Sequence, residues 1–304
     1  MSWIANDDTI IFNSDFNEKL DIELISRYKI IIFSDYVLNK KLFEFYENNK
    51  FNGLIYKESK FNKDVSKLPQ GIIHLIFGHD FNQVISVLPS TLTHLTFGNN
   101  FNQVISVLPP TLTHLIFGHY FNQVISVLPS TLTHLIFGHD FNQVISVLPS
   151  ALTHLTFGNN FNQVVSVLPP TLTHLTLGGN FNQQITFNPN IKYLKLHCDN
   201  QQLIDTLPNS ITTLELGLGD YSFGLKSQVN NLPTSIKKLV FDIHSLYEQD
   251  LNCLPDYIEE LQLNMYYRQR ILNIPSNLKK LICYELYPHK DDFSMCEVET
   301  YTYP

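Results

Sequence analysis

Charged side chains are scarce in this chain of 304 residues, where Asp, Glu, Lys and Arg together make up 16% of the sequence. The scarcity is greatest between residues 71 and 190, which contain two acidic side chains, Asp80 and Asp140, and neither Lys nor Arg. A groove for DNA or RNA needs cations that neutralise phosphates. Because the net charge is also -8, the sequence predicts no nucleic-acid partner and no binding to an anionic membrane.

Cysteines and long hydrophobic runs are equally few. The four cysteines have no regular spacing, so they predict neither a disulfide framework nor a zinc site. Residues 1–8 lack the basic start and apolar core of a secretion signal, and no apolar run is long enough to cross a bilayer. From these absences we expect a soluble, intracellular protein, cytoplasmic in the host or source cell.

The motifs of common catalytic sites are missing too. The sequence has no glycine-rich phosphate loop, no nucleophile elbow and no paired-carboxylate motif. Repeated residues also build surfaces more readily than they build a unique pocket. We therefore expect a protein that is not an enzyme and that has no catalytic residue, no cofactor and no bound metal.

In place of these features the sequence has one phrase of 20 residues. It runs from Phe81 to Asn100 and then begins again after every 20 residues. The later copies start at Phe101, Phe121, Phe141, Phe161 and Phe181. A fixed period of this length is typical of a solenoid, in which each coil packs against the coils before and after it.

Each copy of the phrase predicts one short strand and an extended return. Leu95 and Phe97 have polar neighbours and point to one face of a strand, which Gly98 ends. The β-branched stretch Val84–Val87 disfavours a helix, and Pro89 closes the coil because proline cannot continue a ladder. We predict a mainly-β, right-handed leucine-rich-repeat-like solenoid of about 14 coils, with a parallel concave sheet and an extended convex side.

This phrase resembles the FNIP repeat, a leucine-rich-repeat variant abundant in social amoebae and in giant viruses that infect amoebae. The resemblance covers most of the chain and departs at Val84-Ile85, where the family usually has a proline. The motifs that carry it are Phe81-Asn82, Leu88-Pro89 and the run from Leu92 to Gly98. The phrase is also similar to the short repeats of bacterial leucine-rich effectors. Family members often carry an F-box ahead of the repeats, so the resemblance also implies a ubiquitin-ligase adaptor as an alternative role.

The first 70 residues predict degenerate coils. Leu38–Asn49, rich in Lys, Glu and Leu, predicts one short helix on the convex side. Segments that match the strand of the phrase are Thr9–Phe12, Ile31–Phe33 and Leu54–Tyr56. The competing interpretation is an F-box of three helices within residues 1–50. Helices there would support the adaptor, and strands there would remove it.

We expect residues 1–304 to form a single solenoid. Its predicted parts are degenerate repeats or an N-terminal cap at 1–70, regular repeats at 71–190, degenerate repeats at 191–283 and a C-terminal cap at 284–304. The late coils keep the apolar frame of the phrase, as at Ile191, Leu194 and Leu196. The last segment carries the charges expected of a cap over an exposed strand edge.

Two columns of histidine are predicted, because stacked strands lie about 4.8 Å apart. The first, on the concave face, is His74, His94, His114, His134, His154 and His174, and the second is His79, His119 and His139. One interpretation is a metal-binding or pH-sensing stripe, and the other is that a duplicated phrase carried its histidine along. We expect no metal, because a straight ladder offers a row rather than convergent ligands. Crowded imidazoles should lower one another's pKa by like-charge repulsion.

Two further rows have structural interpretations. Opposite charges are predicted to face each other on neighbouring strands at Lys237-Lys238, Glu259-Glu260 and Lys279-Lys280, as a solvated salt-bridge face. The alternative is a charge pattern specific to a partner. Asn82 and its counterparts in the other copies predict a ladder of amides that satisfies backbone groups at the corner of each coil.

Partner binding is expected at irregular turns or on the concave face. The insertion between Gly217 and Asn231 lengthens one turn, and residues 266–270 gather aromatic and Arg side chains, which are enriched at binding hot spots. Sequence drift is the alternative explanation of both. The candidate residues are Tyr221, Phe223, Tyr266, Arg268, Arg270, His94, His114, His134 and His154.

These observations predict a non-enzymatic repeat scaffold for protein-protein interaction. The alternatives are a substrate-recognition adaptor of a ubiquitin ligase and a structural protein that self-associates through its apolar, uncharged middle. The sequence identifies neither the partner nor the oligomeric state.

Overall fold

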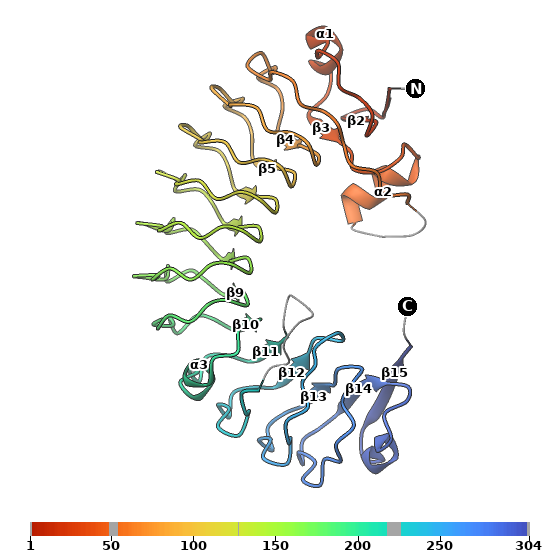
Figure 1. Ribbon diagram of the computed structural model, residues 1–304, viewed down its shortest axis with the longest axis vertical. Coiled ribbons are helices and arrows are strands. Elements are labelled where there is room, and N and C mark those ends of the chain that lie inside the picture. Colours follow the sequence, from red (N-terminus) through yellow and green to blue (C-terminus); the bar gives the residue numbers. More distant parts are fainter. Residues whose placement is uncertain (1, 49–53, 127, 218–225, 303–304) are drawn as a thin grey trace. The chain divides into compact units, whose positions relative to one another are not determined.

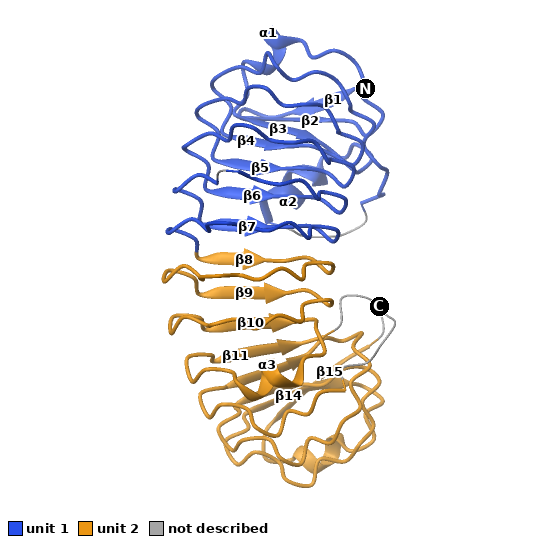
Figure 2. Ribbon diagram, turned by 60° about the vertical axis from the view of Figure 1, so that its left-hand side comes forward, with its two compact units in different colours: residues 1–152 blue, residues 153–304 orange. Residues whose placement is uncertain are grey.

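The computed structural model of the protein describes residues 2–48, 54–126, 128–217 and 226–302. The chain divides into two compact units, residues 1–152 and residues 153–304 (Figure 2). Within each unit the chain winds coil by coil, and most coils add one short strand to a sheet (Figure 1). The predicted mainly-β solenoid with a parallel sheet is therefore confirmed.

In the first unit the strands follow one another through the sheet in chain order. β1 lies antiparallel to β2, whereas the pairs from β2–β3 to β6–β7 are parallel, with His94 opposite His114 for example. The strands are β1 (Trp3–Ala5), β2 (Thr9–Phe12), β3 (Ile30–Phe33), β4 (His74–Ile76), β5 (His94–Thr96), β6 (His114–Ile116) and β7 (His134–Ile136). The helices are α1 (Ile22–Ile25) and α2 (Lys41–Asn48).

In the second unit all neighbouring strands are parallel, again in chain order. The strands are β8 (His154–Thr156), β9 (His174–Leu177), β10 (Tyr193–Leu196), β11 (Thr213–Leu216), β12 (Lys238–Phe241), β13 (Glu260–Gln262), β14 (Lys280–Tyr284) and β15 (Glu297–Tyr301). The other elements are α3 (Gln201–Asp205) and the 3-10 helix η1 (Lys290–Phe293).

The interior of the coils is built from the apolar positions of the phrase. Leu95 and Phe97 are buried, while the side chains between and beside them on the strand are only half-buried. The Phe97 ring stacks on Phe101 of the next corner with centroids 3.9 Å apart, and on Phe77 and Phe117 of the neighbouring coils at 5.8 and 5.5 Å. Aromatic contacts therefore run from coil to coil, as the solenoid requires.

The return path of the regular coils is extended, as the β-branched stretch predicts. Residues 81–88 contain neither helix nor strand. Ile85 points inward and is buried, whereas Val84 and Val87 are 67% and 57% exposed. α3 replaces this extended path in one coil of the second unit. Among the described residues no helix is both long and apolar enough to cross a membrane.

The start of the chain is built from strands rather than from the three helices of an F-box. Residues 2–48 hold β1, β2 and β3, with the short helices α1 and α2 between and after them. The predicted strand Leu54–Tyr56 is wrong, because β3 pairs directly with β4 and Tyr56 instead forms an isolated antiparallel bridge with Tyr36. The corner of that degenerate copy, at Phe61, does pack into the solenoid. Phe61 is buried and stacks on Phe33.

Helix α2 lies on the face of the sheet opposite the one predicted. Its Leu42 and Phe45 pack against Ile11 and Ile32, which point away from the coil interior. β2 and β3 are apolar at successive positions, whereas the strands of the regular coils alternate. The extra isoleucines would leave apolar surface in water without a cover, and the amphipathic helix supplies one.

The C-terminal segment joins the sheet of the second unit. The segment predicted as a cap contributes β15, which pairs in parallel with β14 so that Lys280 lies opposite Glu297. Most of β15 is exposed. Charged side chains along an exposed last strand discourage pairing with another chain.

The predicted asparagine ladder is confirmed at the corners of the coils. The Asn82 side-chain oxygen accepts a hydrogen bond from the backbone N–H of Asn102 at 2.9 Å, and that of Asn102 accepts one from Asn122 at 3.0 Å. The Gln103 side chain also donates to the Asn82 oxygen, at 3.1 Å. The ladder begins in the degenerate coils, where the Asn17 oxygen accepts from Asn62. Each coil thus satisfies a donor of the next one.

Replacing one amide of this ladder should destabilise the fold. In Asn102→Ala the backbone N–H of Asn122 and the side chain of Gln123 lose their acceptor, so the free energy of unfolding should fall by about 1–3 kcal/mol. Gln103→Ala is the control, because the Asn82 oxygen keeps its bond from the Asn102 backbone, and its loss should be smaller. Urea unfolding followed by circular dichroism measures both, and equal losses would contradict this account of the ladder.

Candidate functional site

A row of histidines occupies the face of the first unit's sheet that points away from the coil interior, called here the open sheet face. His74, His94, His114 and His134 lie opposite one another in register on β4 to β7. Their ring centroids are 4.0, 4.0 and 4.1 Å apart in sequence order. The predicted column therefore exists, and it includes the candidate residues His94, His114 and His134.

Threonine hydroxyls hold these rings in place. The Thr93 hydroxyl lies 2.9 Å from Nδ1 of His94 and 3.0 Å from the Ile73 carbonyl. That carbonyl also accepts the backbone N–H groups of Thr93 and His94, at 2.9 and 3.1 Å. In the neutral ring one nitrogen donates a hydrogen bond and the other accepts one. The same pair of contacts recurs at Thr113 and Thr133.

Burial keeps His74 and His94 of this row neutral near pH 7. It lowers the pKa of His94 to about 4, with smaller contributions from the charges of His74 and His134. Burial and then the charge of His114 also lower the pKa of His74. The predicted direction is confirmed, but burial outweighs the repulsion between imidazoles that the spacing alone suggested.

The lowered pKa predicts a fold that weakens in mild acid. An unfolded histidine titrates near pH 6.5, so the stabilising contribution of His94 is complete above about pH 6.5 and is lost as the pH falls toward 4. The urea midpoint should be lower at pH 5.5 than at pH 7.5, a window above the ordinary range of carboxyl groups. His94→Thr should reduce this difference. Equal midpoints at the two pH values in the wild-type protein would refute the expectation.

The corresponding face of the second unit changes from histidine to paired charges. His154 and His174 stack at 4.1 Å on β8 and β9, and burial lowers the pKa of His174. Tyr193 follows in register and donates its hydroxyl to Glu215 at 2.5 Å.

The predicted facing of opposite charges is confirmed on β12 to β14 and beside them. Lys238 pairs with Glu260 at 2.6 Å. Glu259 lies between Lys279, at 2.5 Å, and Lys237, at 3.1 Å, and these contacts lower the pKa of its carboxyl. These lysines and glutamates neutralise one another at the surface, where ion pairs contribute little to stability.

The candidate turn at 266–270 is held by contacts within the chain. Arg270 forms a two-pronged ion pair with Asp292, with distances of 2.8 and 3.0 Å. Arg268 donates to the carbonyls of Met265 and Tyr267 at 2.8 and 2.9 Å. Tyr266 is 42% exposed. The other candidates in an irregular turn, Tyr221 and Phe223, lie outside the described residues.

The second histidine column is assembled only in part. His119 and His139 stack with centroids 4.4 Å apart, and Asp140 contacts His139. His79 stands apart from this pair and contacts Asp80 and Glu58 instead.

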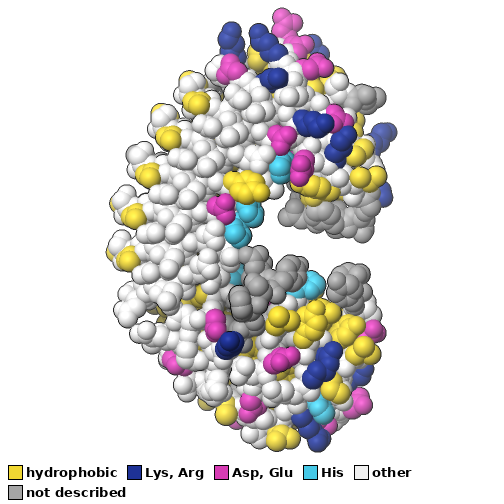
Figure 3. Space-filling model, viewed as in Figure 1, with side chains coloured by type: hydrophobic (Ala, Val, Ile, Leu, Met, Phe, Trp, Pro, Cys, Tyr) yellow, Lys and Arg dark blue, Asp and Glu magenta, His cyan; other side chains and the backbone are white. Residues whose placement is uncertain are grey.

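Exposed valines form a feature that the sequence reasoning did not identify as a surface. They stand on the return side of the regular coils, where Figure 3 shows apolar side chains repeated along the edge with few charges nearby. In the first unit these are Val84, Val87, Val104, Val107, Val124, Val144 and Val147, each between 57% and 76% exposed. Val84 stands one residue before the inward Ile85, and Val87 stands two residues after it. Alternation along an extended segment predicts an outward Val84 but not an outward Val87, so the sequence signalled only half of this surface.

Comparison with known proteins places the repeat in a family. The family model described as FNIP Repeat matches residues 61–100, 101–140, 141–180, 161–188 and 181–219. A search of curated proteins found no match.

Solved structures that are similar to this chain include a giant-virus protein and a bacterial protein. The giant-virus protein CroV588, described as a novel circular LRR protein structure, is 30% identical over 93% of this chain, with a TM-score of 0.61. The chain spans 48% of the length of that protein. YopM from Yersinia enterocolitica WA-314 is 17% identical, with 77% of this chain and 62% of YopM covered and a TM-score of 0.43.

The family match extends from residue 61 to residue 219, which is more than half of the chain. The similarity to CroV588 extends over nearly all of it. These matches agree with the motifs at Phe81-Asn82 and Leu88-Pro89 and with the coil geometry that those motifs produce. The protein belongs to the FNIP-repeat family of leucine-rich-repeat-like solenoids.

Proposed function

We propose that the protein is a non-enzymatic scaffold that binds a protein partner through the open sheet face of its first unit. Repeat solenoids of the leucine-rich type are common protein-interaction scaffolds, and the chain has that architecture. The observation that carries the proposal is the stacked histidine row, in which burial keeps His74 and His94 neutral, so that they offer hydrogen-bonding groups without charge. The organisation of residues 1–304 as one solenoid is part of the same proposal.

The chemistry of this face restricts the partner. Between β4 and β7 the face alternates imidazoles with Thr96 or with isoleucines such as Ile116, and it carries no Lys or Arg. A row of imidazoles next to apolar groups favours a partner that offers polar hydrogen-bonding groups and small apolar side chains. It does not favour a partner recognised by charge, since residues 81–139 contain no charged side chain.

The test is capture of a partner with the intact chain and two sets of variants. His94→Thr, His114→Thr and His134→Thr together remove the row, and threonine already occupies this strand position at Thr213. Tyr266→Ala, Arg268→Ala and Arg270→Ala remove the alternative surface. We expect a given captured protein to be lost with the first set and retained with the second. Retention with the first set and loss with the second would move the site to the turn.

Self-association through the valine rows is the second candidate function. It is favoured by the exposure of Val84, Val104 and Val144, each above 60%, on a part of the chain that lacks repelling charge. Light scattering at increasing protein concentration tests it, with Val104→Ser and Val144→Ser as variants. A mass that stays that of one chain at all concentrations would exclude this function. The adaptor alternative is not proposed, because it required three helices where residues 2–48 hold β1, β2 and β3.

A further inference from the structure

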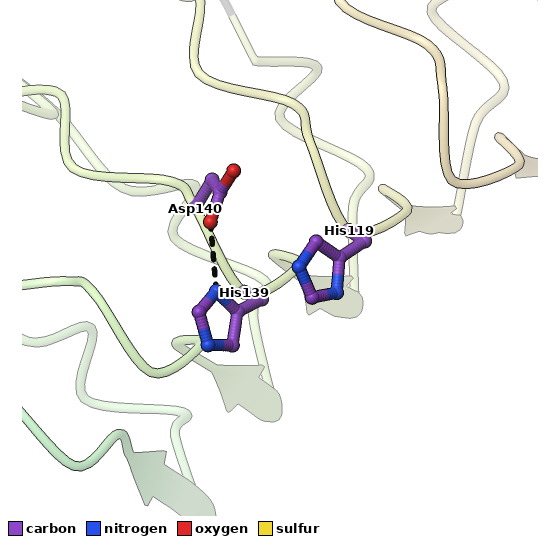
Figure 4. A group of neighbouring side chains, drawn as sticks. All are labelled: His119, His139 and Asp140. Carbon is purple, nitrogen blue, oxygen red and sulfur yellow. Dashed lines mark hydrogen bonds and ion pairs between the residues drawn. The ribbon is translucent and has the colours of Figure 1, made fainter. Parts of the chain in front are cut away.

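Three potential metal ligands meet in the turns that follow β6 and β7 (Figure 4). His119 and His139 occupy equivalent positions of successive coils, and Asp140 follows His139. One ligand atom from each lies within 4.8 Å of the others. The side chains of His139 and Asp140 are 30% and 34% exposed, so an ion from solution can reach them.

The backbone holds these groups at a fixed spacing. The N–H of Asp140 donates to the His119 carbonyl at 2.9 Å, which ties the two turns together. The imidazole rings are parallel within 4°, with centroids 4.4 Å apart. Asp140 lies 2.7 Å from Nδ1 of His139. Because the Nε2 lone pair points away from this carboxylate, a metal ion held by both residues takes the place of the proton between Nδ1 of His139 and Asp140, and that proton is released on binding.

The equivalent positions of the other described coils lack this combination. His79 and Asp80 repeat the His-Asp pair, but the preceding coil has Ser59 there, whose carbonyl accepts from the Asp80 N–H as that of His119 does from Asp140. Glu58 contacts His79 at 3.5 Å, and the Asn100 amide donates to Asp80 at 3.0 Å, so that place has only one imidazole. The histidine row on the open sheet face stacks at a similar spacing, but its Nδ1 atoms contact threonine hydroxyls. Convergence of two imidazoles and a carboxylate is therefore specific to the turns at 119 and 139–140.

We propose that His119, His139 and Asp140 bind a divalent transition metal ion of the zinc class. Two imidazole nitrogens with one carboxylate oxygen suit Zn²⁺, Co²⁺, Ni²⁺ or Cu²⁺, whereas Mg²⁺ and Ca²⁺ prefer oxygen ligands throughout. A zinc ion with three protein ligands keeps a further position for water or for a ligand atom from another molecule. The sequence suggested metal binding only by a stripe of histidines. In this site the third ligand is Asp140, which was not part of either histidine column.

The variants that test this proposal come from sister coils. Asn99 and Asn159 stand where His119 and His139 do, and Asn100 and Asn160 stand where Asp140 does, so His119→Asn, His139→Asn and Asp140→Asn use residues that the coil already accommodates. The full chain is titrated with ZnCl2 by calorimetry and with CoCl2 by absorption spectroscopy. We expect one saturable site per chain, and each variant should weaken Zn²⁺ binding at least about tenfold.

His79→Asn and His94→Thr are the matched controls, since each removes one imidazole outside the cluster. Both should keep the affinity and the cobalt spectrum of the wild type. The proposal is overturned if the three cluster variants bind Zn²⁺ as tightly as the wild type, or if the controls weaken binding equally. Circular dichroism of each variant without metal checks that the fold is retained.

Discussion

Gly98→Ala should unfold the first unit or reduce its stability by more than about 4 kcal/mol, in the range reached only by changes with a distinct structural cause. A Cβ at this position would lie 1.9 Å from the carbonyl oxygen of Gly78 in the preceding coil. The carbonyl oxygen is part of the backbone and the Cβ is fixed to it, so neither atom can move away alone and the two coils would have to separate. That separation would also pull Phe97 away from Phe77, on which it stacks.

Gly71→Ala is the control for this prediction. An added Cβ there has nothing within 4 Å, and neither glycine has a left-handed φ. The control should leave stability within about 0.5 kcal/mol or raise it slightly, because alanine restricts the unfolded chain. Chemical denaturation of the purified variants measures the difference. A Gly98→Ala protein as stable as Gly71→Ala would mean that the coils are not in contact at this corner.

Phe97→Ala should cost about 3–5 kcal/mol, the range for removing a buried aromatic ring. Phe97 is 2% exposed and stacks on Phe101 at 3.9 Å. The cavity would lie between coils rather than inside one, because Phe77 and Phe117 flank the ring on either side. The loss should therefore appear in the single main unfolding transition measured with urea.

Phe97→Leu provides the graded comparison. Leu177 occupies the same position of the coil that contains β9, so leucine fits the site and should cost only about 1–2 kcal/mol. Val104→Ala, at a side chain that is 61% exposed in the following return segment, should change stability by less than about 0.5 kcal/mol. Equal losses for the Phe97 and Val104 variants would contradict the assignment of core and surface.

The regular coils could be predicted because every level of their sequence agrees. The period places Leu95 and Phe97 on one face, the β-branched stretch excludes a helix and the proline ends the return, so a single arrangement satisfies all three. The degenerate start could not be predicted as well. Leu54–Tyr56 has the composition of a strand, yet Ile55 and Tyr56 are 68% and 55% exposed. Because β4 pairs directly with β3, this segment has no place in the sheet.

The placement of α2 was wrong for a related reason. A helix of eight residues has an apolar stripe that fits either side of a coil, and the sequence of the helix does not choose between them. The choice comes from Ile11 and Ile32 on the strands, whose side chains point to the open face and need cover. Reading β2 and β3 as apolar on both faces would have located the helix.

The sequence predicted the positions of the histidines in rows, but not the contacts or the pKa values of their side chains. Spacing alone places His94 opposite His114. It does not reveal that Thr93 holds the ring or that burial dominates the lowered pKa. The His119, His139 and Asp140 cluster was missed because only columns of histidine were considered, whereas the third ligand is the aspartate that follows His139 and belongs to neither column.

The stacking of neighbouring copies one rung apart is the claim on which the rest depends, and cross-linking tests it directly. Thr96 and Ile116 lie opposite each other in register, about 4.8 Å apart, and Ile136 lies one rung further on. In a background with the exposed Cys253 replaced by Ser, Thr96→Cys with Ile116→Cys should form an intramolecular disulfide under mild oxidation. Thr96→Cys with Ile136→Cys should not, because two rungs exceed the reach of a disulfide. Equal yields from the two pairs, or a bond only in the second, would contradict the account.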